Sequence, residues 1–347
     1  MTIIRPSSAT VKSVLELAVE NGRNRFAAET IAPVLNVENQ SGQILYVDPN
    51  ADLFAPGQIV RAPGADPETI RRNVGEKLSY TCEDRSLADA IPIEGMSADE
   101  FWVRRFNSLQ ASATDLVHMV RTGNEVRFRD SLTASMTAAG NVVDVAAGPG
   151  PFNDDSVNPI KVLNQYIEDV TYNRGIRPNA LFLSDKTARA IQDNAIFRQY
   201  FFQAETGRQF AASGGVLTAL AALLRLDLVH TVDVGLVAPQ NLAADKVLAP
   251  IWGETALLYH RDETQVPHRT RGLARTLIWN PDDRDAVMEL AGGADMMIDG
   301  YVVMIKAADE GNLTVRVNLH RWMADPTINP AAGLLITNTV EDDTDTG

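Results

Sequence analysis

The sequence is poor in several features that mark particular classes of protein. Its 347 residues include a single cysteine, Cys82, which excludes an intrachain disulfide and is typical of a reducing compartment. The longest apolar run, at residues 216–224, is far shorter than the roughly 20 residues that cross a bilayer. The first residues contain no apolar segment and no cleavage pattern typical of a signal peptide. We therefore expect a soluble protein that is made in a cytosol and has no membrane partner.

Motifs for catalysis and cofactor binding are also missing. The five histidines form no His-x-x-x-His or Cys-His spacing, so we expect no metal site. A glycine pair at residues 214–215 precedes an apolar helix, but no Gly-Lys-Ser/Thr follows it, which leaves nucleotide binding a weak alternative. There is no Gly-x-Ser-x-Gly elbow, and no histidine neighbours Cys82. The sequence predicts no enzyme, no catalytic or metal site and no cofactor.

Composition and charge place the chain among globular proteins. It is 45% apolar and 22% charged, and it is long enough for two domains and a sizeable core. The net charge of −14 argues against the chain as a whole binding nucleic acid or an anionic membrane, although a local basic patch stays open.

One stretch at residues 39–82, here called the extended arm, cannot easily fold by itself. Its ends alternate apolar and polar side chains like β-strands, with Ile44 and Tyr46 at the start and Leu78 and Tyr80 near the end. Between them lie about thirty residues rich in proline and glycine, and a structureless segment that long is usually functional. We expect that something outside the extended arm holds it in place.

The strongest helix signal follows the extended arm. Residues 97–100 form a capping box with acidic residues in the first turn. An apolar stripe then recurs at steps of three and four over residues 97–122, which predicts a long core helix that serves as a scaffold. Gly123 is expected to end or bend it before a second helical stretch at 125–136. The stripe consists of Trp102, Phe106, Leu109, Ala113, Leu116 and Val120.

Other elements alternate without a regular strand–helix–strand order. Short helices are expected at residues 10–21 and 216–224, and Asn158 with Pro159 is typical of a helix start. Residues 180–183 predict a buried strand, and Ser184 is placed to cap a following helix. The last third predicts strands at 255–259, 276–279, 301–306, 313–319 and 333–337. The pattern favours an α+β fold.

Several short motifs occur in a characteristic order along nearly the whole chain. They are Ser41-Gly42, residues 61–64 (Arg-Ala-Pro-Gly), 79–83, 152–155 with 158–160, 177–182, 251–254 with 258–259, and 332–336. In this order and spacing the chain resembles the major capsid proteins of tailed bacteriophages, which have the Hong Kong 97-type fold.

The resemblance implies a division of the chain into named parts. These are an N-terminal arm (1–38), the extended arm as the E-loop (39–82), a peripheral domain (83–175) with a spine helix at 97–122, an axial domain (176–247), a return to the peripheral domain (248–340) and an acidic tail (341–347). The E-loop of this fold lies across a neighbouring subunit, where an arm with unpaired backbone groups gains partners. The implied interface residues on it are Arg61, Ala62, Pro63, Gly64, Arg71 and Arg72.

Two departures from relatives qualify this expectation. Some relatives join their subunits through a Lys–Asn isopeptide bond with the lysine on the E-loop, but the middle of the extended arm contains no lysine. We therefore predict a non-covalent shell, held in part by pairing of Arg61, Arg71 and Arg72 with a neighbour's carboxylates. Other relatives carry a long N-terminal scaffolding segment that a protease removes; the region before the extended arm is short here, so no such cleavage is expected.

The implied partners are further copies of the chain, arranged as pentamers and hexamers in an icosahedral virion shell that assembles in the host cytoplasm. A separate scaffolding protein, a portal and a decoration protein are further expected partners. Double-stranded DNA would be enclosed without specific binding, because the chain is acidic. Two alternatives stay open at this point: an encapsulin-like nanocompartment shell protein, and a soluble enzyme with an unrecognised site.

Overall fold

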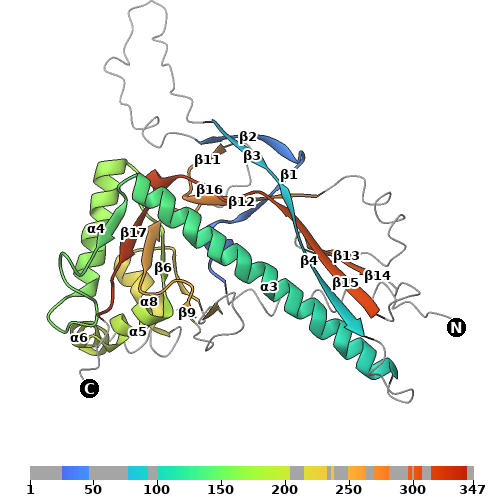
Figure 1. Ribbon diagram of the computed structural model, residues 1–347. Coiled ribbons are helices and arrows are strands. Elements are labelled where there is room, and N and C mark those ends of the chain that lie inside the picture. The colour runs from blue at the N-terminus through green and yellow to red at the C-terminus, as the bar shows by residue number, and fades with distance from the viewer. Residues whose placement is uncertain are drawn as a thin grey trace, which may run out of the picture.

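The computed structural model describes residues 26–46, 77–92, 101–203, 215–232, 236–237, 249–262, 269–280, 296–298, 301–306 and 314–341. Two sheets lie at opposite ends of one long helix, α3, which crosses the molecule (Figure 1). Helix and strand are mixed, so the predicted α+β class is confirmed. The helix expected at residues 10–21 lies outside the described residues.

Helix α3 (Phe101–Ala138) is one continuous element of 38 residues. At 1.5 Å per residue it spans about 57 Å. The prediction of a break at Gly123 was wrong, because the predicted helix and the second helical stretch are halves of the same helix. A glycine inside a helix costs only about 1 kcal/mol relative to alanine. The packing of α3 before and after Gly123, against two different sheets, outweighs that cost. The capping box at 97–100 lies outside the described residues.

The first sheet contains the longest strand pair among the described residues. Strands β4 (Glu83–Pro92) and β15 (Thr314–Met323) run antiparallel over ten residue pairs, from Glu83 opposite Met323 to Pro92 opposite Thr314. The other edge of β15 pairs with β14 and β12, and β1 adds to β12 in parallel. The remaining bounds are β1 (Val34–Val37), β12 (Ala274–Trp279), β13 (Met296–Ile298), β14 (Tyr301–Lys306) and β16 (Thr327–Ile328).

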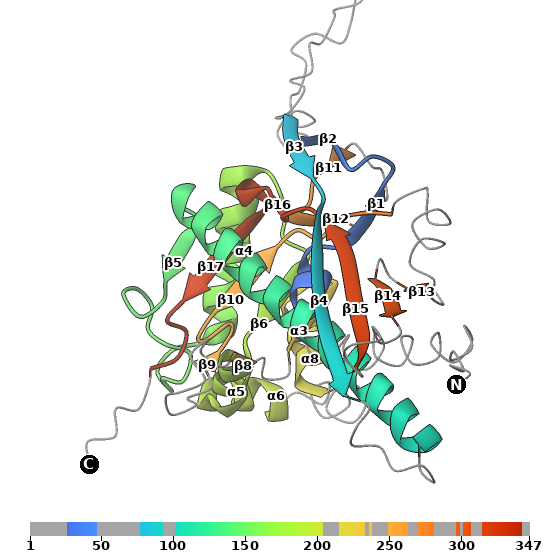
Figure 2. The same ribbon diagram turned by 45° about the vertical axis from the view of Figure 1, so that its right-hand side comes forward.

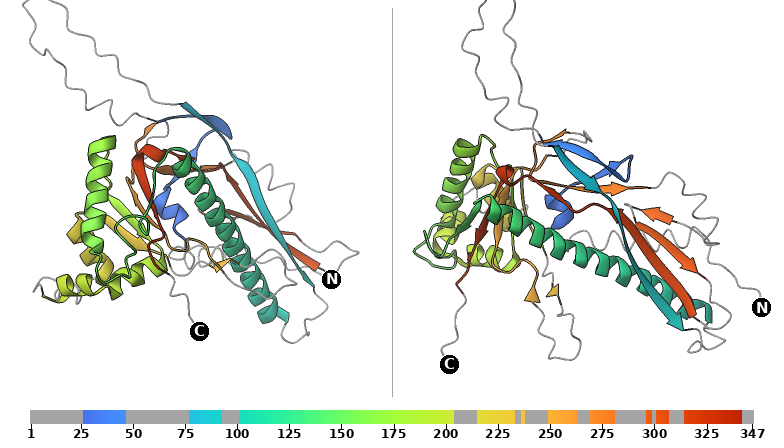
Figure 3. Two further views of the ribbon diagram at one scale, coloured as in Figure 1. Left: turned by 60° about the vertical axis from the view of Figure 1, so that its left-hand side comes forward. Right: turned by 45° about the horizontal axis from the view of Figure 1, so that its top comes forward.

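The second sheet has the order β5-β17-β10-β6-β7. Its strands are β5 (Val142–Asp144), β6 (Ala180–Leu183), β7 (Leu228–Thr231), β10 (Ala256–Tyr259) and β17 (Gly333–Thr337). Every residue of β6 and β10 is buried, as expected of central strands with continuous apolar sequence. Helices gather around this sheet (Figure 3): α4 (Pro159–Arg174), α5 (Asp185–Asp193), α6 (Ala195–Gln203) and α8 (Gly215–Leu224).

Local sequence signals explain where several of these helices begin. The side chain of Asn158 accepts a hydrogen bond from the backbone N–H of Lys161, and Pro159 occupies the first position of α4. Ser184 caps α5 in the same way through the N–H of Thr187. Both predictions are confirmed, as is the apolar helix α8.

Helix α3 packs on both sheets and so joins their cores. Its first half packs apolar side chains such as Leu116 and Val120 against Tyr301 and Leu319 of the first sheet. Its second half packs Phe128, Leu132 and Met136 against the second sheet. The scaffold role predicted for Leu116 and Val120 is consistent with their burial. The side chains of Trp102, Phe106 and Leu109 lie outside the described part of α3.

The expected boundary between the axial and peripheral segments stays a prediction. Strand β6 of the axial segment pairs with β10, and β10 in turn pairs with β17 from the end of the chain. Within the described residues, no helix is both long enough and apolar enough to cross a membrane.

Candidate assembly site: the base of the extended arm and its junction with the long helix

The base of the extended arm is a small three-stranded sheet. Strands β2 (Ser41–Tyr46) and β3 (Lys77–Thr81) pair antiparallel, from Ser41 opposite Thr81 to Leu45 opposite Lys77. Strand β11 (Arg269–Thr270) adds in parallel to β2. The two strands expected at the ends of the extended arm are therefore confirmed. Its middle lies outside the described residues, and with it the predicted interface residues Arg61, Ala62, Pro63, Gly64, Arg71 and Arg72.

Buried apolar contacts fasten this base to the first sheet. Ile44 and Cys82 pack with Leu35, Leu277 and Ala324 in one cluster. The Cys82 side chain is fully buried, and burial raises the pKa of its thiol, so this cysteine packs as a small apolar residue. The backbone N–H of Cys82 donates to the carbonyl oxygen of Gln40 at 2.8 Å, which closes the neck of the extended arm.

The returning strand of the extended arm leads directly into the long β4–β15 ladder. Strand β3 ends at Thr81, Cys82 is the only residue between, and β4 begins at Glu83 (Figure 2). The whole of β4 then pairs with β15. The extended arm is therefore attached to ten residue pairs of sheet, not to a loop.

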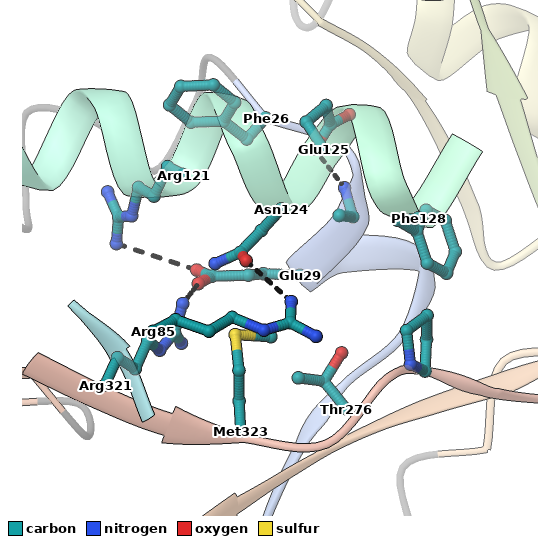
Figure 4. A pocket seen from close by; sticks show the side chains of 12 residues that line it. Phe26, Glu29, Arg85, Arg121, Asn124, Glu125, Phe128, Thr276, Arg321 and Met323 are labelled. Carbon is teal, nitrogen blue, oxygen red and sulfur yellow. Dashed lines mark hydrogen bonds and ion pairs between the residues drawn. The ribbon is translucent and has the colours of Figure 1, made fainter. Parts of the chain in front are cut away.

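Glu125, in the middle of α3, holds the segment that precedes the extended arm (Figure 4). Its carboxylate accepts hydrogen bonds from the backbone N–H groups of Ala27 and Ala28 at 2.9 and 2.8 Å, and from the indole N–H of Trp252 at 2.5 Å. Ala27 cannot cap the short helix α2 (Ala28–Ile31) with its own side chain, so Glu125 supplies the acceptor from another element. Burial is the largest influence on Glu125 and raises its pKa.

A second cluster of buried polar side chains lies beside Glu125, around Tyr301. The Tyr301 hydroxyl accepts from Nη1 of Arg321 at 2.6 Å and from Nε of Arg121 at 3.3 Å. Both guanidinium groups also pair with Glu29 of α2, at 2.9 Å from Arg321 and 3.6 Å from Arg121. Burial raises the pKa of the Tyr301 hydroxyl, so this group stays protonated and neutral.

Arg85 of β4 completes the junction. It donates to the Asn124 side chain at 2.9 Å and pairs with Asp325 at 2.5 Å. Burial lowers the pKa of Arg85, and the neighbouring Asp325 opposes that shift. The junction thus links four elements through polar contacts: α2 by Glu29, α3 by Arg121, β4 by Arg85 and β15 by Arg321 (Figure 4).

Sequence reasoning did not identify this junction. Its partners are far apart in the chain, as with Glu125 and Ala27, whose positions differ by 98 residues. The available signal was that Arg121 and Glu125 are charged residues adjoining the apolar stripe of a core helix. Such residues must find buried partners, but the sequence does not name them.

Two further findings concern metal-ligand clusters and titratable pairs in the described residues. No group of three or more His, Cys, Asp or Glu side chains there could hold a metal ion. One titratable pair occurs in the second sheet, where Nε2 of the half-buried His230 lies 2.9 Å from the hydroxyl of the buried Tyr259. Burial, with a smaller contribution from Arg261, lowers the pKa of His230 to about 4, so the ring is neutral at physiological pH.

Comparison with known proteins gives a likeness in structure alone. No family model matches the sequence, and no curated protein matches it. A phage-related protein from Bordetella bronchiseptica RB50 matches with a TM-score of 0.63 and 15% identity, over 98% of this chain and 99% of that one. A protein assigned as a prophage capsid protein from Escherichia coli CFT073 matches with a TM-score of 0.56 and 11% identity, over 96% and 99%.

The capsid of the cyanophage P-SCSP1u also matches, with a TM-score of 0.52 and 13% identity, over 91% of this chain and 88% of that one. These likenesses cover nearly the full length of each chain. The protein therefore has the fold of phage capsid proteins, as the sequence motifs predicted.

Proposed function

We propose that the chain is the major capsid protein of a tailed bacteriophage, and that many copies assemble into the icosahedral head that encloses double-stranded DNA. The observation that carries this proposal is the full-length likeness to phage capsid folds, which includes the structure of a cyanophage capsid. The base of the extended arm also supports the proposal, because a strand pair that is fastened to a long sheet can present a projecting segment to a neighbour.

In this proposal the extended arm lies across a neighbouring subunit. Its middle has few large apolar residues and several prolines, so it gains little by folding on its own chain. Contact with a second copy supplies partners for its backbone and buries its side chains. Arg61, Arg71 and Arg72 would pair with carboxylates of the neighbour, whereas residues 61–64 would form the tight part of the contact.

The shell would hold without covalent links. The six lysines are Lys12, Lys77, Lys161, Lys186, Lys246 and Lys306, and none lies in residues 47–76. The net charge of −14 per copy would let the shell surround DNA without binding it tightly, so that closure of the shell confines the genome. Scaffolding, portal and decoration proteins are the proposed partners during assembly in the host and in the virion.

Size-exclusion chromatography followed by negative-stain microscopy of the purified chain tests this function. Shells, or rings of five and six subunits, are the expected outcome. A stable monomer or dimer would contradict the proposal. Particles that package a protein cargo in the native host, in place of DNA, would instead identify an encapsulin-like compartment.

A further inference from the structure

One end of the second sheet gathers three arginine side chains that form no ion pair within the described residues, and we call it the basic end. Arg177 and Arg225 each lie three residues before a strand, β6 and β7, and the first residues of these strands pair with each other. Both arginines are exposed and line one groove between α4 and the end of α8. Arg174, in the last turn of α4, donates to the backbone oxygen of Gly333, which is aligned through β10 with the start of β6.

Positive charge dominates the basic end, although the net charge of the chain is −14. Glu168 is the carboxylate that lines the groove, against two arginines there, and the exposed Tyr172 lines it as well. The C-terminal ends of α4 and α8 each add about half a negative charge, which the three arginines exceed. Farther from the groove the positive groups again outnumber the negative ones: Arg261, Arg271 and Arg275 against Asp227 and Asp262. Tyrosine and arginine are also the residue types that most often dominate binding at protein interfaces.

The opposite end of the same sheet gathers four carboxylates that form no ion pair within the described part of the chain, and we call it the acidic end. Asp144 is the last residue of β5 and is aligned with the last residue of β17, whereas Asp154 and Asp155 lie in the loop that leads to α4. These three carboxylates accept hydrogen bonds from uncharged groups only, namely backbone N–H groups and one asparagine side chain. Glu341 lies beside them, because its backbone exchanges two hydrogen bonds with the side chain of Asn153.

The cations of α5 and α6 do not neutralise the acidic end, because they already have other partners. Each pairs with a carboxylate close to it: Lys186 with Glu254, Arg189 with Asp185, and Arg198 with Asp193. Lys161, in the first turn of α4, adds one exposed cation against the four carboxylates. The second sheet therefore carries unpaired positive charge at one end and unpaired negative charge at the other.

We propose that the basic end of one copy of the chain binds the acidic end of the next copy. Each end supplies the charges that the other lacks, and complementary charges of this kind fix the register and orientation of two partners. The contact is head-to-tail, because the two surfaces differ and every chain carries both. Repeating such a contact closes a ring when the rotation between copies fits a full turn. This inference rests on the proposed function, since it names one contact within the proposed assembly.

The basic end adjoins the base of the extended arm. Arg271 directly follows β11, which pairs with β2 of that base. The backbone N–H of Leu273 then donates at 2.9 Å to the carbonyl oxygen of His260, the residue after β10. The arm base accordingly lies toward one end of α4, and α5 and α6 lie toward the other (Figure 1). A neighbour that the extended arm reaches would therefore approach the basic end.

Charge reversal tests the interface, scored by size-exclusion chromatography and negative-stain microscopy of the full chain. The first variant carries Arg177→Glu and Arg225→Glu, and the second carries Asp154→Lys and Glu341→Lys. All four side chains are exposed, so the subunits should stay folded by circular dichroism. Each variant should lower the yield of assemblies by roughly tenfold or more, because like charges would then face each other. The variant with all four substitutions should assemble again, because both ends are reversed together.

A matched control keeps the two substitutions of the first variant and adds Asp89→Lys and Asp115→Lys, at exposed positions of β4 and α3. It has the same net charge as the fourfold variant and should stay unassembled. Normal assembly of both reversed variants, no recovery in the fourfold variant, or equal recovery in the control would each overturn the inference. Shells of the first variant that form normally but hold less DNA would also overturn it, because the basic end would then be a site for DNA. If the unaltered chain stays monomeric, the proposed function itself fails before any substitution is made.

Discussion

Tyr301→Phe tests whether the buried polar junction stabilises the subunit. The substitution removes one oxygen atom and keeps the ring, so the apolar packing of Tyr301 against α3 is unchanged. It leaves two buried guanidinium donors without their shared acceptor, at 2.6 Å for Arg321 and 3.3 Å for Arg121. A hydrogen bond to a charged group contributes about 1.5–3 kcal/mol, and the longer bond contributes less, so the free energy of unfolding should fall by about 2–4 kcal/mol.

The assay is urea unfolding of the unassembled subunit, followed by tryptophan fluorescence and by far-ultraviolet circular dichroism. Tyr172→Phe is the matched control, because the Tyr172 side chain is 84% exposed and its variant should stay within about 0.5 kcal/mol of the parent. A Tyr301→Phe loss no larger than that of the control would refute the reasoning. It would mean that the two guanidinium groups find other acceptors at no cost.

Three further predictions concern pH, covalent linkage and assembly. The pKa of His230 falls from its usual 6.5 to about 4 on folding, so the contribution of the neutral ring to the free energy of unfolding should be fully present above pH 6.5. The free energy of unfolding should then decrease by up to about 3 kcal/mol as the pH falls to 4. His230→Gln should flatten this dependence when unfolding is measured over that pH range. Denaturing gels of mature shells should show the monomer band alone, and ladders of higher mass would contradict a non-covalent shell. Replacing residues 48–75 with a short Gly-Ser turn should leave subunits folded by circular dichroism but abolish shells on negative-stain grids, whereas shells of normal yield would exclude the extended arm from assembly.

Elements governed by local chemistry could be predicted from the sequence. Asn158 with Pro159 and Ser184 each place a hydrogen-bonding side chain within three residues of the N–H that it caps. The strands at both ends of the extended arm were likewise predictable, because alternation of apolar residues requires only neighbouring positions. The break expected at Gly123 was wrong because a local preference of about 1 kcal/mol is small beside the packing of α3 on two sheets.

The junction could not be predicted, since its geometry depends on tertiary structure. Glu125 accepts from backbone groups of Ala27 and Ala28, and backbone N–H groups carry no sequence signature. Tyr301 and Arg121 differ by 180 positions, and nothing in either residue type identifies the other. Polar pairs of this kind become visible only when the fold brings them together.

The direct passage of β3 through Cys82 into β4 has a mechanical consequence. A pull on the extended arm along β3 would load β4 along its own length. The inter-strand hydrogen bonds of an antiparallel pair lie across the strands, so a lengthwise load is shared among all ten pairs with β15 and does not open them one at a time. In the proposed shell, tension between subunits would then pass through the β4–β15 ladder, and the neck at Cys82 would transmit it.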